Sequence, residues 1–131
     1  MLIGIYVGRE NATSRLGPLA EHLKDSVETQ GIQTKVSYCC LCKANPEEKL
    51  PEIIINHPHP GNTPSCNKGI QKIIEKFPDT IFYIIDFESK RKKDLGKYPN
   101  MHYITRENSP EIFTKFRDIK KHYKELTSHQ Q

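Results

Sequence analysis

The residues best suited to chemistry follow a short apolar run, PEIII, that ends at Ile55. The next six residues, NHPHPG, hold one amide and two imidazoles in a proline-rich loop. Imidazoles titrate near neutral pH and can transfer protons. An amide such as Asn56 is neither a nucleophile nor a good Mg²⁺ ligand, and the chain has no nucleophile elbow, P-loop or dinucleotide-binding glycine motif. We therefore expect no enzymatic activity.

The cysteines invite a metal interpretation. Cys39 and Cys42 have the spacing of a zinc knuckle, and His57 and Cys66 would complete a set of thiolate and imidazole ligands. However, the second pair is poorly spaced, and the strands beside the two halves of this set are not neighbours in the sheet predicted below. Cysteine is also common as a small buried residue. Our first expectation is therefore no metal and no cofactor, with zinc at these four positions as the less favoured alternative.

Apolar periodicity predicts the elements that position these residues. Short runs rich in β-branched and aromatic residues predict strands at residues 2–7, 32–38, 53–55, 80–85 and 101–105. Helices are expected at residues 16–27, near 45–46, after a loop over 62–68, within 87–100, and from Ser109 onward. Ser109-Pro110-Glu111 is a strong helix start, with an N-cap hydroxyl and proline in the first turn.

Strands that alternate with helices imply parallel βαβ crossovers. We expect an α/β fold with a three-layer, doubly wound, five-stranded parallel sheet of flavodoxin-like order 2-1-3-4-5. One domain would span residues 1–127, followed by a frayed tail at 128–131. Ligands of such sheets bind at the carboxyl ends of the strands, beside the point where the order reverses, here after strands one and three.

Composition sets the broad class of the protein. The chain has 131 residues, 35% of them hydrophobic and 27% charged, with a net charge of +4. Its longest apolar runs have the length of a strand, so we expect no membrane span. The beginning of the chain, MLIGIYVGRE, lacks the basic flank and cleavage site of a signal peptide. We therefore expect a cytoplasmic protein with reduced thiols.

Five segments form an ordered pattern: Pro51–Gly61, Gly69–Ile70, Phe77–Thr80, Tyr103–Arg106 and Asn108–Glu111. In order and spacing they resemble the receiver domain of two-component response regulators. The first resembles the signature P-D-hydrophobic strand-D-x-x-x-P-G. The others resemble the glycine-led helix, the P-D-T before strand four and the passage into the last helix. The resemblance implies a flavodoxin-like fold with a phosphorylation pocket.

The resemblance also implies that the reactive residues of the family are replaced here. The phosphoacceptor aspartate corresponds to Asn56, and the Mg²⁺-binding acidic pair corresponds to Gly8 and Arg9. Arg106 corresponds to the lysine after strand five, and Asp86 stands where the family has a hydroxyl residue. Phosphorylation of a receiver needs a carboxylate nucleophile and a cation held by anionic oxygens. The pocket is therefore expected to be inert.

We expect this degenerate pocket to survive as a scaffold. The cations of Arg9 and Arg106 would replace the charge of the metal, and their partners would be Glu10 or Asp86. The full set is Gly8, Arg9, Glu10, Asn56, Asp86 and Arg106. This arrangement predicts a pseudo-receiver, a non-enzymatic signalling or regulatory module held in one conformation.

A basic run suggests where a partner would bind. The candidate residues are Lys90, Arg91, Lys92, Lys93, Lys120 and Lys124. The resemblance implies that strand five and its flanking helices contact a protein partner, and the basic charge would suit an acidic one. The run lacks the interleaved aromatic residues that favour nucleic acid. The plainer interpretation of such a run is a solvated surface.

One alternative from another class stays open. Residues 8–13 could supply hydrogen-bond donors to a phosphate at a helix N-terminus, and residues 57–65 would then lie against a flavin. Against this, the chain has no Trp, and neither loop contains a Tyr to stack on the ring. The alternative is a flavodoxin-like protein or enzyme that binds a small molecule such as a flavin or nucleotide.

Overall fold

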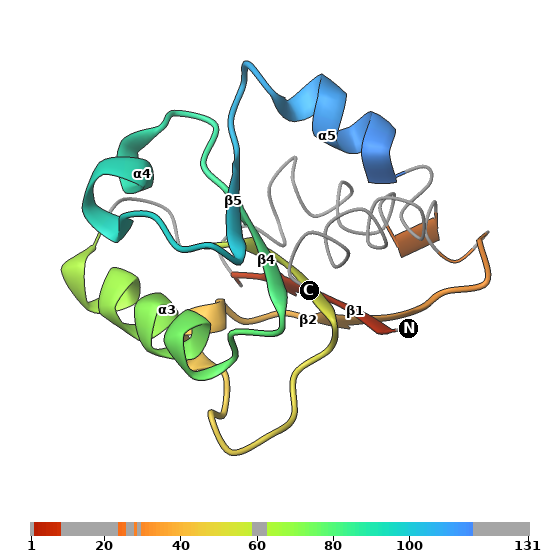
Figure 1. Cartoon of the computed structure of the whole chain (residues 1–131), viewed down its shortest axis with the longest axis horizontal. Helices are drawn as coiled ribbons and strands as arrows, with labels where there is room; N and C mark the ends of the chain where they lie inside the picture. Colours follow the sequence, from red (N-terminus) through yellow and green to blue (C-terminus); the bar gives the residue numbers. More distant parts are fainter. Residues whose placement is uncertain (1, 9–23, 26–27, 29, 59–62, 117–131) are drawn as a thin grey trace.

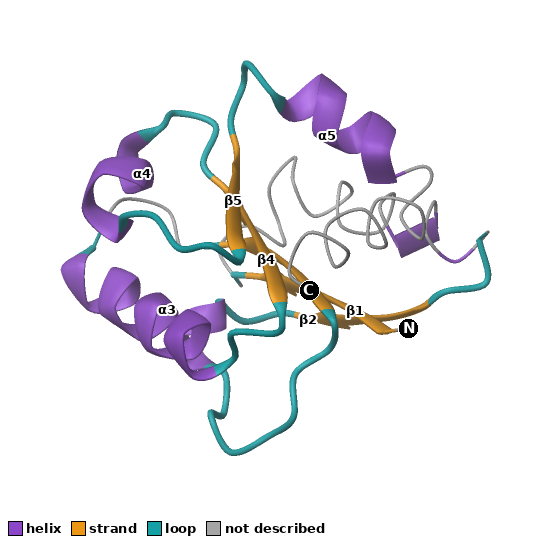
Figure 2. Ribbon diagram, viewed as in Figure 1, coloured by secondary structure: helices purple, strands orange, loops and turns teal. Residues whose placement is uncertain are grey.

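Five parallel strands form the centre of the molecule, and helices cover both faces of the sheet (Figures 1 and 2). The computed structural model describes residues 2–8, 24–25, 28, 30–58 and 63–116. The strands are β1 (Leu2–Val7), β2 (Gln33–Ser37), β3 (Ile53–His57), β4 (Ile81–Ile85) and β5 (Met101–Ile104). The other described elements are a 3₁₀ turn, η1 (Leu41–Lys43), and the helices α3 (Pro64–Lys76), α4 (Lys90–Leu95) and α5 (Ser109–Phe116).

The strand order is β2-β1-β3-β4-β5, and every neighbouring pair is parallel. This confirms the predicted α/β class and the flavodoxin-like order. The register of β1 and β3 pairs Tyr6 with Asn56 and Val7 with His57. The carboxyl ends of β1 and β3 therefore lie side by side at the point where the order reverses, as the prediction required.

Residues 53–55 of β3 and the whole of β4 are buried on both faces because helices cover both faces. On one face, Ile55 and Tyr83 belong to an apolar cluster that includes Ile112 of α5. On the other face, Ile54 belongs to a second cluster that includes Ile74 of α3. Figure 2 shows α3 and α4 on one side of the sheet and α5 on the other. The described elements thus form the three expected layers.

Strand β3 and helix α3 are both longer than the sequence predicted. Asn56 and His57, expected in a loop, belong to β3 because β1 continues far enough to pair with both. The loop expected over residues 62–68 is wrong, since α3 begins at Pro64. Proline is well suited to the first helical position because it has no N–H to satisfy, and Thr63 precedes it with an extended backbone.

Other predicted elements differ or lie outside the described residues. In place of a helix near residues 45–46 the chain forms a turn, in which the N–H of Glu48 donates to the carbonyl of Asn45 at 3.2 Å. The helical turn η1 lies just before it. Most of the helix predicted at residues 16–27 and the whole tail 128–131 lie outside the described residues.

Helix α4 is short and is bounded by left-handed or otherwise unusual backbone at both ends. Ser89 precedes it with a φ of 58°, and Gly96 follows it with a φ of 89°. A non-glycine residue in this region costs on the order of 1 kcal/mol. The buried carboxylate of Asp86 offsets this cost, because it accepts the N–H groups of Arg91 at 3.0 Å and Lys92 at 2.9 Å. The end of β4 thereby fixes the start of α4.

Helix length bears on membrane association. The longest described helix, α3, has 13 residues, whereas about 20 apolar residues are needed to span a bilayer. Within the described ranges, no helix is long and apolar enough to cross a membrane.

Candidate functional site

Asn56, the centre of the predicted pocket, is fully buried. Its side chain is 0% exposed. Its Oδ1 accepts the N–H of Leu41 at 3.2 Å, which fastens η1 to β3. Its Nδ2 is also buried and has no hydrogen-bond partner among the described residues. The amide thus links two elements and does not face solvent.

The positions after β1 are only partly described. The N–H of Gly8 donates to the carbonyl of His57 at 3.1 Å, so a backbone hydrogen bond joins the tips of β1 and β3. Arg9 and Glu10 lie outside the described residues. The ion pairs predicted for these two side chains therefore stay a prediction.

Asp86 and Arg106 lie in different surroundings. Asp86 is buried and holds the start of α4, as described above. Arg106 is exposed. The hydrogen bond and charge of Lys90 lower the pKa of the exposed Glu88, and the charge of Arg106 lowers it further. The ion pair expected between Arg106 and Asp86 is not among the contacts of the described residues.

Three of the four cysteines converge where η1 packs against α3. The Sγ atoms of Cys40, Cys42 and Cys66 all lie within 4.8 Å of one another, and those of Cys40 and Cys66 are 3.6 Å apart. Cys42 and Cys66 thus meet, as the zinc alternative required, although β2 and β3 are not adjacent. Cys40 takes the place predicted for Cys39, and His57 is not part of this group.

A buried cation lies beside the thiols. The side chain of Arg91 is only 4% exposed. Its Nη1 donates to the Sγ of Cys66 at 3.4 Å and to the Oδ1 of Asn67 at 2.8 Å. The prediction that Arg91 belongs to a basic surface is therefore wrong, because its guanidinium finds acceptors inside the fold. The lysines predicted with it on α4, Lys90, Lys92 and Lys93, are exposed, whereas Lys120 and Lys124 lie outside the described residues.

The three thiols hold their protons differently. The hydrogen bond from Cys40 lowers the pKa of Cys66, and the charge of Arg91 lowers it further. The same contact raises the pKa of Cys40, as does burial. Burial raises the pKa of Cys42. Anionic charge therefore concentrates on the sulfur of Cys66, next to the guanidinium.

His57 ends β3 in a partly buried position. Burial lowers its pKa to about 4, and the charge of Arg91 acts in the same direction. Its Nδ1 is buried and has no hydrogen-bond partner in the described part of the chain. The imidazole is therefore neutral at physiological pH and is not poised for proton transfer there.

The lowered pKa of His57 predicts that acid weakens the fold. The unfolded chain takes up a proton near pH 6.5, whereas the folded chain does so only near pH 4, so stability falls as the pH drops through this window. We expect a loss of roughly 1 to 2 kcal/mol, reduced from the full linkage value because the ring is partly exposed. Urea unfolding of the wild type and His57→Gln between pH 7 and pH 4 measures it. An equal pH dependence in both proteins would contradict the assignment.

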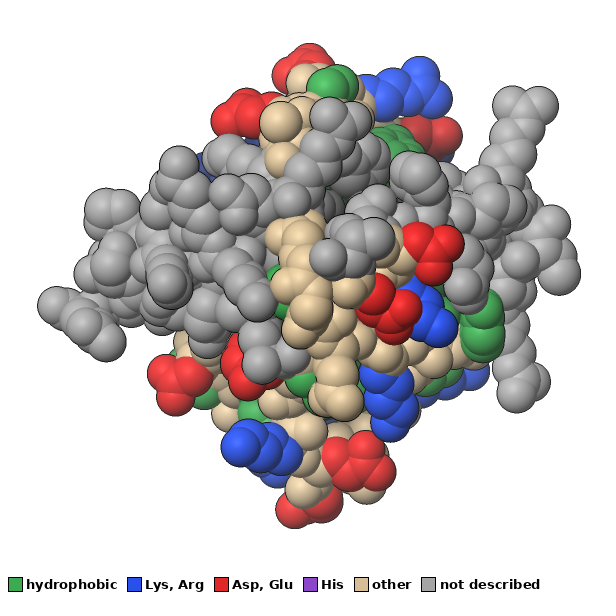
Figure 3. Space-filling model, turned by 90° about the vertical axis from the view of Figure 1, so that its right-hand side faces the viewer, with side chains coloured by type: hydrophobic (Ala, Val, Ile, Leu, Met, Phe, Trp, Pro, Cys, Tyr) green, Lys and Arg blue, Asp and Glu red, His purple; other side chains and the backbone are tan. Residues whose placement is uncertain are grey.

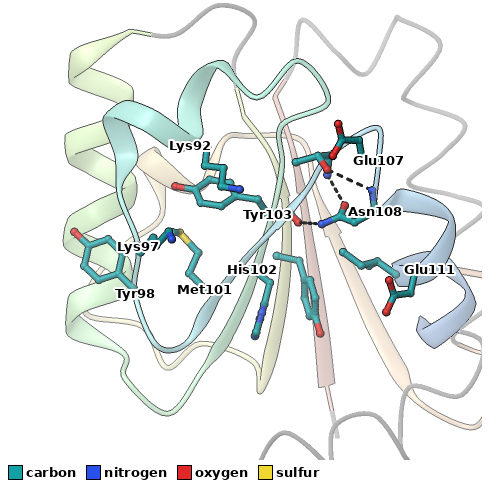
Figure 4. Close-up of a pocket in the computed structure, with 12 residues that line it drawn as sticks. Lys92, Lys97, Tyr98, Met101, His102, Tyr103, Glu107, Asn108 and Glu111 are labelled. Carbon is teal, nitrogen blue, oxygen red and sulfur yellow. Dashed lines mark hydrogen bonds between the residues drawn. The ribbon is translucent and has the colours of Figure 1, made fainter.

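A groove of about 540 Å³ runs along β5, the edge strand of the sheet (Figure 4). Its lining includes the aromatic residues Tyr83, Tyr98, His102 and Tyr103. Charged side chains of both signs also line it, namely Lys92, Lys97, Glu107 and Glu111. Figure 4 shows the labelled lysines beside α4 and Glu111 on α5, with β5 between them. The groove therefore offers aromatic area flanked by opposite charges.

Ring packing and a hydrogen bond stiffen the lining of this groove. The rings of Tyr83 and His102 stack with their centroids 5.2 Å apart. On the other face of β5, the hydroxyl of Tyr103 donates to the carbonyl of Gly96 at the end of α4. Both contacts fix side chains of β5 against their neighbours, so the groove is largely preformed.

The side chain of Asn108 closes part of the free edge of β5. Its Oδ1 accepts the N–H of Thr105 at 2.7 Å, and its Nδ2 donates to the carbonyl of Tyr103 at 2.8 Å (Figure 4). Residues 100 and 104 turn their carbonyls inward to β4, so residues 103 and 105 present their backbone groups outward. The amide of Asn108 thus satisfies groups that another strand would otherwise pair with.

Replacement of Asn108 by alanine is expected to expose this edge. The variant loses two hydrogen bonds, which lowers the free energy of unfolding by about 2 kcal/mol, and it self-associates more readily. Urea unfolding and sedimentation at rising concentration measure the two effects. Asn45→Ala is a matched control, since Asn45 bonds the N–H of Glu47 in an exposed turn away from the sheet. Equal self-association of the two variants would contradict the role of Asn108.

Several of these residues escaped prediction from the sequence. Cys40 follows Cys39 directly, and the zinc-knuckle spacing pointed to the wrong one of the two. Arg91 was hidden in a run of four basic residues whose side chains are otherwise exposed. Asn67 carries no local signal, because its partner is the side chain of Arg91, 24 positions further along the chain. Asn108 carries none because its partners are backbone groups at the end of β5.

The surface charge of the described residues is mixed on one large face of the molecule. Figure 3 shows acidic and basic side chains intermingled there among the described residues. Around α4, by contrast, the exposed side chains are mainly lysines, together with Asp94. Exposed lysines therefore predominate on α4.

Comparison with known proteins assigns no family to this chain: no model of a protein family matches it, and no curated protein matches it.

Proposed function

We propose that this chain is a receiver-like, non-enzymatic interaction module that acts without phosphorylation and binds an acidic protein surface. Its contact surface would consist of the exposed side of α4 and the groove along β5. The proposal follows the resemblance of the sequence to receiver domains and the departures at the reactive positions.

The state of Asn56 carries the proposal. A receiver needs an accessible carboxylate at the end of its third strand, where phosphorylation occurs. This chain has an amide there, 0% exposed and bonded to the N–H of Leu41. Neither the chemistry nor the exposure suits phosphoryl transfer, which supports a scaffold that works in one state.

Charge near the groove supports an acidic partner. Lys92 and Lys97 line the groove and are exposed, and Lys93 is exposed beside them on α4. Aromatic rings in the same groove provide the amphipathic area that is enriched at protein interfaces. A negatively charged segment that lay on the α4 side of the groove would therefore meet both lysines and rings, whereas Glu107 and Glu111 line the side toward α5.

Phosphorylation can be tested directly. The wild type is incubated with acetyl phosphate and Mg²⁺, beside a receiver domain that retains its aspartate, and both are analysed by intact mass spectrometry. We expect a phosphoryl adduct on the control domain and none on this chain. An acid-stable or hydroxylamine-sensitive adduct on this chain would contradict the proposal, as would flavin or nucleotide released from the purified protein on denaturation.

The contact surface can be tested with a fluorescent polyglutamate peptide. We expect the triple variant Lys92→Glu, Lys93→Glu and Lys97→Glu to weaken binding at least tenfold at low salt, because like charges then face the peptide. The matched control carries Lys35→Glu, Lys43→Glu and Lys49→Glu, which change net charge equally at exposed positions on β2 and the connection to β3. Equal weakening in both variants would show attraction by net charge alone and would exclude this surface.

A further inference from the structure

We propose that Cys40, Cys42 and Cys66 bind one thiophilic divalent cation, with Zn²⁺ as the probe, beside the guanidinium of Arg91. The inference is independent of the proposed interaction surface. It depends on the mutual placement of three sulfurs, the packing that sets this placement, and the charge next to them.

The sulfur distances suit one shared cation. Zn²⁺ binds thiolate sulfur at about 2.3 Å, so tetrahedral coordination holds the sulfurs about 3.8 Å apart. Cys40 and Cys66 have their Sγ atoms 3.6 Å apart, and Cys42 completes a triangle with no side longer than 4.8 Å. Shifts of about 1 Å or less would therefore bring all three sulfurs onto the cation.

Two contacts build this triangle from distant parts of the sequence. Gly69 of α3 lets η1 approach closely, since a Cβ at that position would lie 2.8 Å from the Cβ of Cys42 and 3.0 Å from its carbonyl oxygen. Asn56 holds the other side of η1 through the N–H of Leu41. The turn that carries Cys40 and Cys42 is thus clamped between β3 and the helix that carries Cys66.

The charge of the surroundings favours a divalent cation. Cysteine binds metals as the thiolate, and soft thiolate ligands select cations such as Zn²⁺ over Mg²⁺ or Ca²⁺. Three thiolates, one divalent cation and the guanidinium of Arg91 are neutral together. Neutrality matters because Cys40 and Cys66 are 0% and 4% exposed, and uncompensated charge is costly in such a place.

Three sulfurs leave one position of a tetrahedral Zn²⁺ for another donor. Zinc sites with three protein ligands commonly hold water or a substrate there. Arg91 donates to Cys66 and Asn67 at this cluster, so it would orient a ligand sulfur in the manner of other hydrogen-bond donors to metal ligands.

Metal uptake by the purified, phosphine-reduced full chain tests the site. The protein is mixed with excess Zn²⁺ and desalted, and bound zinc is measured by elemental analysis and native mass spectrometry. We expect one Zn²⁺ per chain. Substitution by Co²⁺ should add the visible and sulfur-to-metal charge-transfer bands typical of tetrahedral thiolate coordination.

Variants assign the ligands. Cys42→Ser and Cys66→Ser should each weaken Zn²⁺ binding more than about 100-fold in competition with a chromophoric chelator, beyond the effect of losing a supporting contact. Cys39→Ser is the matched control and should leave the affinity unchanged, since Cys39 is adjacent to the cluster but outside it. Gly69→Ala should weaken binding with all thiols retained, because it displaces Cys42.

Circular dichroism of each metal-free variant shows whether it still folds. If Cys66→Ser does not fold, Cys42→Ser decides the question, because Cys42 is partly exposed and tolerates the change more readily. The proposal would be overturned if Cys42→Ser left zinc uptake unaffected, or if Cys39→Ser weakened zinc binding as much as the cluster variants do. It would also be overturned if the reduced protein bound no zinc and the untreated protein held a Cys40–Cys66 disulfide instead.

Discussion

Replacement of Asn100 by aspartate is expected to lower the free energy of unfolding by about 4 kcal/mol at pH 7. Asn100 is 6% exposed, and its Nδ2 donates to the carbonyls of Phe77 at 3.0 Å and Thr80 at 2.9 Å. A carboxylate would face two carbonyl oxygens, so the new side chain must keep its proton to fold. Holding an aspartic acid protonated at pH 7, roughly three units above its ordinary pKa, costs about 4 kcal/mol.

The pH dependence gives this prediction its signature. The folded variant keeps a proton that the unfolded chain releases, so its loss relative to the wild type shrinks as the pH falls, by about 1.4 kcal/mol per unit. Urea unfolding of both proteins at pH 7 and pH 5 measures the difference. Asn100→Ala is the control and should lose about 2 kcal/mol at both pH values, because it removes hydrogen bonds but adds no charge. An equal loss for aspartate at the two pH values would refute the explanation.

Replacement of Gly69 by valine is expected to lower the free energy of unfolding by about 3 kcal/mol. The closest atoms to an added Cβ are the Cβ, the carbonyl oxygen and the Cα of Cys42, at 2.8, 3.0 and 3.1 Å. Two of the three are backbone atoms, which cannot rotate away. The turn η1 must therefore move from α3, and the apolar cluster that includes Leu41 opens with it.

A valine elsewhere on the same helix separates packing from helix propensity. Lys72 is exposed on α3, and Lys72→Val should cost about 0.5 kcal/mol, the difference in intrinsic helix preference. Thermal and urea unfolding compare the two variants. A similar small loss for both would show that η1 does not depend on the close approach at Gly69.

The two proposals meet at α4 and remain separable. The helix turns Arg91 inward to Cys66 and presents Lys92 and Lys93 to solvent. The triple variant Lys92→Glu, Lys93→Glu and Lys97→Glu should weaken binding of the polyglutamate peptide without removing zinc. Cys42→Ser should remove zinc without weakening binding of the polyglutamate peptide. Either proposal can therefore fail while the other holds.

Sequence patterns were sufficient to predict the parallel sheet. Apart from the largely polar edge strand β2, the strands are short runs rich in apolar residues, and the spacing between runs leaves room for a crossover. The order of the strands and the rim on which their ends lie could therefore both be inferred. The limits of β3 and α3 were less accurate, because pairing with β1 extended the strand and Pro64 started the helix early. Local propensity reflects neither the pairing with β1 nor the exact start of the helix.

The thiol cluster could not be inferred in the same way. Its members come from η1, from the residue just before η1 and from α3, more than twenty positions further along the chain. Which of Cys39 and Cys40 points inward depends on the path of an irregular connection. Arg91 likewise turns inward because Asp86 sets the start of α4 and because Cys66 and Asn67 accept its N–H groups.

The amino-acid sequence by itself determined the class of fold, because apolar spacing and crossover length are local properties of the chain. Tertiary structure alone decided that an amide would be sealed in the core at the end of β3, that one arginine of a basic run would be buried, and that three thiols would meet. Those outcomes depend on how closely two backbones approach at Gly69 and on which acceptors lie within reach, and both are properties of packing.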